Sequence, residues 1–90
     1  MTIEVISAVR TGEDLVEISV QWPDRLAVYT FVRDPRPPLP VINSHDVWQD
    51  FRTRVDVYEQ MYRLAWRAYL GKEIVLPVQL PTGVYPPRAR

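Results

Sequence analysis

Residues 44–70, SHDVWQDFRTRVDVYEQMYRLAWRAYL, decide the fold that we predict for this chain. The stretch contains no proline or glycine, and it holds six of the ten aromatic residues of the protein. Its apolar residues recur every three or four positions, which is the period of an amphipathic helix. Asn43 or Ser44 can cap its start, and Gly71 is placed for a left-handed C-cap. We therefore expect one continuous helix over 44–70, about 40 Å long.

The surface of this helix carries two apolar stripes. The first stripe comprises Trp48, Phe51, Val55, Tyr58, Tyr62, Ala65 and Tyr69. The second stripe comprises Val57, Met61, Leu64 and Ala68. Together they cover more than half of the circumference, whereas a helix on one sheet needs an apolar arc of about 100° or somewhat more. We expect the first stripe to pack on a sheet and the second to meet a partner, most simply the same helix in a second copy. The alternative is a monomer in which the proline segments and a last strand wrap the excess.

Arg54 interrupts the apolar arc beside Phe51, Val55 and Tyr58, one turn after Asp50. In one interpretation this end of the helix overhangs the sheet and Arg54 is solvated. In the other, Arg54 makes a specificity contact in an interface and pairs with Asp50. The candidate partner interface accordingly consists of Arg54, Val57, Met61, Leu64 and Ala68.

Three strands are predicted ahead of the helix, over residues 2–10, 15–22 and 26–33. The second alternates most clearly, with Val16, Ile18, Val20 and Trp22 on one face, as in a half-buried antiparallel strand. The turns between the strands are short, so a meander in the order 1-2-3 is the simplest topology.

Prolines divide the rest of the chain into short segments. Residues 34–42 should form a polyproline II linker to the helix. A docking ligand is the alternative, because the prolines within this linker give a PxxP spacing. Residues 72–80 alternate as a strand, which Pro77 restricts to a sheet edge. Residues 81–90 read as an extended, flexible tail. The predicted fold is therefore α+β, in the order β-β-β-α-β, as a single domain over 1–80.

The amino-acid composition limits the classes of function that the chain can have. The chain has no cysteine and a formal net charge of zero, and no apolar run approaches the ~20 residues of a membrane-spanning helix. Disulfides are excluded, and we expect a cytoplasmic protein that does not contact membranes. Ser44, His45 and Asp46 are adjacent and so cannot face one another as a catalytic triad, and capping explains them. The histidine and carboxylates show no metal spacing, and the three glycines are isolated. We expect that the protein is not an enzyme and that it binds no cofactor and no metal ion.

The function we predict is a non-enzymatic interaction or accessory protein that acts through the helix surface, as a homodimer. A short, cysteine-free, arginine-rich chain suits a bacterial or phage accessory protein, and a monomeric phage-type inhibitor or virion component is one alternative. The other alternative is nucleic-acid binding, in which strand aromatics stack on bases and arginines contact phosphates. Its residues would be Tyr29, Phe31, Arg52, Arg63 and Arg67, although zero net charge argues against it.

Overall fold

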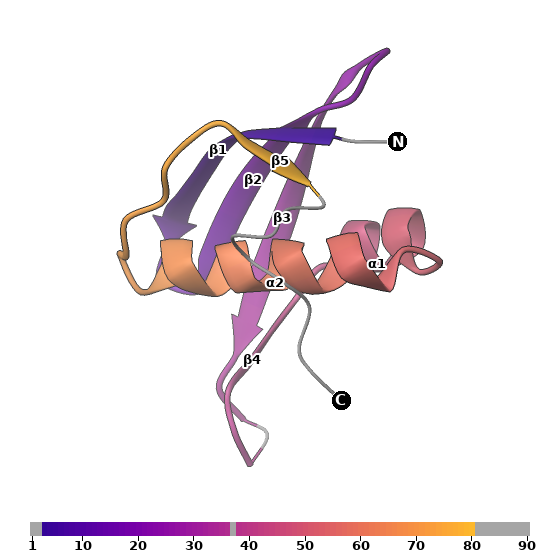
Figure 1. The fold of residues 1–90 in the computed structure, drawn as a ribbon. Coiled ribbons are helices and arrows are strands. Elements are labelled where there is room, and N and C mark those ends of the chain that lie inside the picture. The colour runs from indigo at the N-terminus through magenta and orange to yellow at the C-terminus, as the bar shows by residue number, and fades with distance from the viewer. Residues whose placement is uncertain (1–2, 37, 81–90) are drawn as a thin grey trace.

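The structure is a computed structural model that describes residues 3–36 and 38–80 (Figure 1). The elements along the chain are β1 (Ile3–Gly12), β2 (Leu15–Gln21), β3 (Leu26–Asp34), β4 (Val41–Asn43), α1 (His45–Phe51), α2 (Val55–Tyr69) and β5 (Val78–Leu80). The strands form one antiparallel sheet in the order β4-β3-β2-β1-β5. The predicted α+β class is confirmed.

The first three strands form the predicted meander. In β2, the alternating residues Val16, Ile18 and Val20 are fully buried, because they face the helices while their neighbours face away. β1 pairs with β2 through two register shifts, one between Val5 and Ser7 and one between Arg10 and Gly12. Such bulges increase the local twist of a strand and help the sheet to curl.

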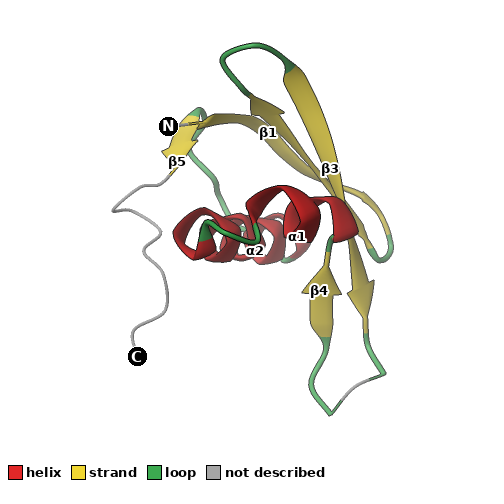
Figure 2. Ribbon diagram, turned by 90° about the vertical axis from the view of Figure 1, so that its right-hand side faces the viewer, coloured by secondary structure: helices red, strands yellow, loops and turns green. Residues whose placement is uncertain are grey.

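The proline-rich stretch does not lead directly to the helix, as the sequence had suggested. Val41–Asn43 folds back as β4 and pairs with the end of β3, where Ile42 lies opposite Arg33. Pro35, Pro38 and Pro40 therefore lie in the loop of a β3–β4 hairpin, which projects from the body (Figures 1 and 2). Two β-branched residues are sufficient for this short edge strand, but three residues are too few to show a period.

The single helix predicted over 44–70 is divided in two, and this corrects the sequence-based prediction. α1 ends at Phe51 and α2 begins at Val55, with the amide of Arg54 donating to the Phe51 carbonyl at 2.9 Å in the connecting turn. α1 packs against β3, whereas α2 runs over β1, β2 and β4. A helix of about 40 Å would overhang a body whose longest dimension is 36 Å, so the break lets both segments contact the sheet.

Local signals set the helix ends as expected. The Ser44 hydroxyl accepts a 3.3 Å hydrogen bond from the Val47 amide at the start of α1. Beyond the end of α2, Gly71 has φ of 72° and its amide donates to the Ala68 carbonyl at 3.2 Å. The predicted last strand is reduced to β5, which pairs with Ile3–Val5 at the sheet edge. The predicted tail, 81–90, lies outside the described residues.

The sheet separates a packed side from an open side. Both helices lie against one face, and no described element lies on the other (Figure 2). The core between sheet and helices includes Phe31 from β3, Val47 from α1, and Met61 and Leu64 from α2, all fully buried. No helix in the described part of the chain is long and apolar enough to cross a membrane.

Candidate interaction surfaces

The second stripe of α2 faces the sheet. Val57, Met61 and Leu64 are at most 2% exposed and belong to the core, and Ala68 is partly buried against it. A partner cannot contact these three side chains while the helix remains on the sheet. Of the first stripe, which was expected to form the core, only Phe51 and Ala65 are buried. The second stripe therefore faces the sheet instead of a partner, whereas Trp48 and Val55 of the first stripe are exposed.

Arg54 lies in the turn between the helices, at the N-cap position of α2. Its guanidinium contacts the Asp56 carboxylate, with Nε to Oδ1 at 3.3 Å, and this contact lowers the pKa of Asp56. Asp50, the partner expected from the sequence, instead accepts from Tyr29. Because α1 ends before Arg54, the i,i+4 spacing from Asp50 no longer brings the two side chains together.

The residues of the nucleic-acid alternative do not come together on one surface. Tyr29 and Phe31 are buried beneath the helices, so their rings cannot stack on bases. Arg52 and Arg63 are exposed, whereas Arg67 is partly buried and donates to the Glu73 carbonyl at 2.6 Å. Phe31 packs edge-on against Tyr62, with ring centroids 5.3 Å apart. These strand aromatics therefore hold the helices on the sheet.

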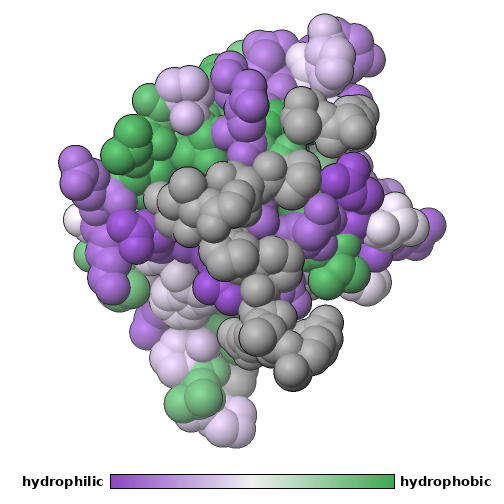
Figure 3. Space-filling view, viewed as in Figure 1, coloured by the Kyte–Doolittle hydropathy of each residue, from purple (hydrophilic) through white to green (hydrophobic). Residues whose placement is uncertain are grey.

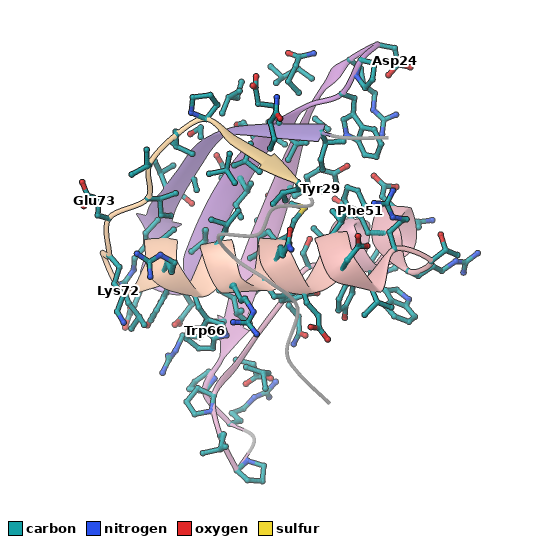
Figure 4. All side chains as sticks on the ribbon, in the orientation of Figure 1. Asp24, Tyr29, Phe51, Trp66, Lys72 and Glu73 are labelled. Atoms are coloured by element: carbon teal, nitrogen blue, oxygen red, sulfur yellow. The ribbon has the colours of Figure 1, made fainter. Side chains whose placement is uncertain are left out.

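A polar and aromatic cluster fixes α1 to the sheet. The Tyr29 hydroxyl donates to Asp50 and accepts from Trp22 Nε1 at 3.2 Å. The Trp22 ring stacks on Phe51 at 5.3 Å and 9° between planes, and the Arg25 guanidinium lies 4.7 Å from the centroid of the Trp22 ring. Figure 4 shows Tyr29 and Phe51 together between the sheet and α1. Burial, followed by the Asp50 contact, raises the pKa of Tyr29 to about 12.

A second cluster fixes the far end of α2. The guanidinium groups of Arg10 and Arg33 lie 4.2 and 5.2 Å from the centroid of the Tyr69 ring. Arg33 also pairs with Asp14 at 3.2 Å. Arg10 further donates to the carbonyl of Glu13 at 2.6 Å. These arginines are committed to internal contacts and are not a phosphate-binding patch.

The outward face of α2 carries aromatic rings and opposite charges. A hollow of about 260 Å³ on this helix is lined by Glu59, Tyr62, Arg63 and Trp66. Trp66 lies on the side of α2 nearer β4 (Figure 4). Tyr62 is held in place because its hydroxyl accepts from the Ser44 amide at 3.1 Å. The helical wheel placed Tyr62 in the stripe expected to form the core and placed Trp66 in neither stripe.

The rings continue from this hollow toward α1. Tyr58 lies 4.7 Å from Tyr62 and 5.9 Å from Trp48, measured between ring centroids, and Trp48 is half exposed. In the space-filling view of this side, hydrophilic residues dominate, and the largest hydrophobic area lies over the loop between α2 and β5 (Figure 3). In the hollow itself, Glu59 and Arg63 lie beside Tyr62 and Trp66, so charged groups border these rings as in the polar rim of a protein interface.

The open face of the sheet is a second surface, and sequence reasoning missed it. It exposes six apolar side chains of β1, β2 and β3 by 40% to 57%: Ile6, Val9, Leu15, Leu26, Val28 and Val32. An antiparallel sheet with one solvated face normally alternates apolar and polar residues more strictly. The sequence of β3 carries a signal for this face, because Leu26, Val28 and Val32 alternate with the residues of a second face that is also apolar, Ala27, Tyr29 and Phe31.

His45 and the acidic residues form no metal-binding group in the part of the chain that the structure describes. No cluster of three or more histidine or acidic residues suited to a metal ion occurs among residues 3–36 and 38–80. His45 is exposed at the first turn of α1. Comparison with family models, curated proteins and solved structures finds no match. Function must therefore be inferred from the two surfaces themselves.

Proposed function

We propose that this chain is a non-enzymatic interaction protein that forms a homodimer through the outward face of α2. The observation that supports this proposal is the hollow in which Glu59 and Arg63, of opposite charge, accompany Tyr62 and Trp66. Tyrosine, tryptophan and arginine are the residue types that most often dominate the energy of protein interfaces.

The charges of this face complement themselves. Glu59 and Arg63 are separated by one turn of α2. If two copies of α2 pack antiparallel about a two-fold axis between these positions, Glu59 of each copy faces Arg63 of the other. A two-fold interface repeats each contact, so one such arrangement makes two ion pairs. The aromatic rings then pack across the axis, where water is excluded.

Charge reversal tests this arrangement directly. We expect wild-type protein at micromolar concentration to scatter light as twice 10.6 kDa. The Glu59→Arg and Arg63→Glu variants should each be monomeric, because each places like charges opposite one another. An equimolar mixture of the two variants should recover the dimer, since the two-fold axis then pairs an all-basic with an all-acidic face.

The control is Glu73→Arg, which makes the same charge change in the exposed loop after α2 and should leave the dimer intact. Circular dichroism confirms that each variant is folded. A monomeric wild type, or reversals that leave the dimer unchanged, would refute the proposed homodimer. Failure of the mixture to associate would refute the two-fold pairing of Glu59 with Arg63.

A further inference from the structure

The open face of the sheet has an asymmetric distribution of charge. The acidic residues of the five strands are Glu4, Glu17 and Asp34, and all three occupy outward positions in the register. The basic residues of the strands are Arg10 and Arg33, and both face the helices. The chain as a whole has no net charge, so the open face is negative while the helix side holds the balancing arginines.

Glu17 is at the centre of this face. It lies on β2, the middle strand of the sheet, opposite Val9 on β1 and Thr30 on β3. Neither cross-strand neighbour can neutralise a carboxylate, and Glu17 forms no ion pair within the described residues. Asp34, by contrast, is paired with Arg36 at 3.0 Å. The outward neighbours of this central carboxylate are the apolar Val9 and Leu15 and the uncharged Thr30 and Ser19, so it requires a cation from whatever covers it.

We propose that the open sheet face binds an amphipathic, basic helix of another protein, with a lysine or arginine placed over Glu17. A sheet whose second face is apolar commonly buries it under a further layer of helices. A helix of about five turns is about 27 Å long, which matches the length of the three long strands. Its apolar stripe would contact Val9, Val28 and Val32 around the ion pair.

The same charges exclude the simplest alternative occupant. A second copy packed face to face would bring two Glu17 carboxylates together on the apolar surface, where like charges are most costly. Nucleic acid and anionic lipid are repelled by a face that carries Glu4 and Glu17 in addition to the neutral Asp34–Arg36 pair. The site is also independent of the outward face of α2, because the sheet lies between the two surfaces (Figure 2).

A pair of synthetic peptides provides the probe. One is an amphipathic leucine–lysine helix of about five turns and the other is its leucine–glutamate counterpart. We expect labelled leucine–lysine peptide to bind the full chain by fluorescence anisotropy, and the glutamate peptide not to bind. The Glu17→Lys variant should weaken lysine-peptide binding by at least about tenfold and should gain binding of the glutamate peptide.

Matched controls separate the site from general attraction. Glu73→Lys makes the same charge change away from the face and should alter binding less than about twofold. Val28→Ser should weaken binding by roughly tenfold, because Val28 contacts the peptide. Val55→Ser should have no effect, although Val55 is 50% exposed and Val28 is 52% exposed. Backbone amide shifts in NMR should move in β1, β2 and β3 and remain unchanged in α2.

Three outcomes overturn the inference. The first is no binding of the leucine–lysine peptide, and the second is an equal loss of binding in Glu73→Lys and Glu17→Lys. The third is a wild-type dimer that Val28→Ser dissociates, which would assign the open face to a second copy. If Glu59→Arg dissociates the dimer but still binds the leucine–lysine peptide, the α2 homodimer is supported. Failure of one proposal is therefore distinguishable from failure of the other.

Discussion

The Tyr29 hydroxyl donates a 2.8 Å hydrogen bond to Oδ2 of Asp50, and this contact ties the third strand to α1 across 21 residues of chain. The same Asp50 oxygen lies 3.8 Å from the Arg25 guanidinium. The bond therefore joins a buried ring to a partly exposed carboxylate at the edge of the core. The Tyr29–Asp50 bond holds α1 against β3, so that α1 does not form one continuous helix with α2.

Removing this bond should loosen α1 measurably. We expect Tyr29→Phe to lower the free energy of unfolding by about 1–2 kcal/mol, because Trp22 Nε1 loses its acceptor as well. Asp50→Ala should cost a similar amount. In urea denaturation the double variant should cost less than the sum of the two singles, with a coupling of at least about 0.5 kcal/mol. Strict additivity would show that the bond does not form in solution.

Alkaline pH should destabilise the fold through two tyrosines. Burial is the main cause that raises the pKa of both Tyr29 and Tyr62 from 10.0 to about 12. In the unfolded chain these hydroxyls ionise near pH 10, so above that pH the unfolded state binds fewer protons than the native state. Their contribution to stability is complete below pH 10 and is lost as the pH rises toward 12. Melting temperatures of wild type, Tyr29→Phe and Tyr62→Phe between pH 8 and 12 check this, and the variants should show the shallower decline.

The sequence was sufficient for the three-strand meander, because β2 and β3 alternate strongly and short turns leave few topologies. It was not sufficient for the division of the helix. The connection between the helices, residues 52–54, includes no proline or glycine. The break arises from packing instead, since Phe51 at the end of α1 stacks on Trp22. Tertiary contacts of this kind override local helix propensity and leave no local signal.

The orientation of α2 on the sheet explains why the candidate surfaces were misassigned. The helical wheel placed residues 48 to 69 on one axis, but α1 and α2 have separate axes, so one angular origin cannot serve both. Aliphatic Val57, Met61 and Leu64 then fill the space over the sheet, while Tyr62 keeps its hydroxyl at the edge near Ser44. A stripe predicts that a helix has an apolar face, but it does not say which of two such faces meets the sheet.

Gly71 should be required for the end of α2. Its φ is 72°, which an L-residue adopts only with strain, and a Cβ there would meet no atom within 4 Å. The cost of Gly71→Ala is thus conformational, about 1 kcal/mol in the free energy of unfolding. Gly12→Ala is the control, because its Cβ would make an ordinary 3.4 Å contact with Leu15. Equal effects of the two substitutions in urea denaturation would contradict a left-handed C-cap.

The orientation of α2 can be decided by one matched pair of substitutions. Met61 is fully buried against the sheet, whereas Val55 on the same helix is 50% exposed. Met61→Asp should unfold the protein, because an unpaired carboxylate in the core costs at least several kcal/mol and a domain of this size has little more stability to lose. Val55→Asp should keep the circular dichroism spectrum and the melting temperature within a few degrees of wild type. If Met61→Asp instead stays folded and only halves the mass measured by light scattering, then Met61 belongs to a partner interface and α2 must be rotated on the sheet.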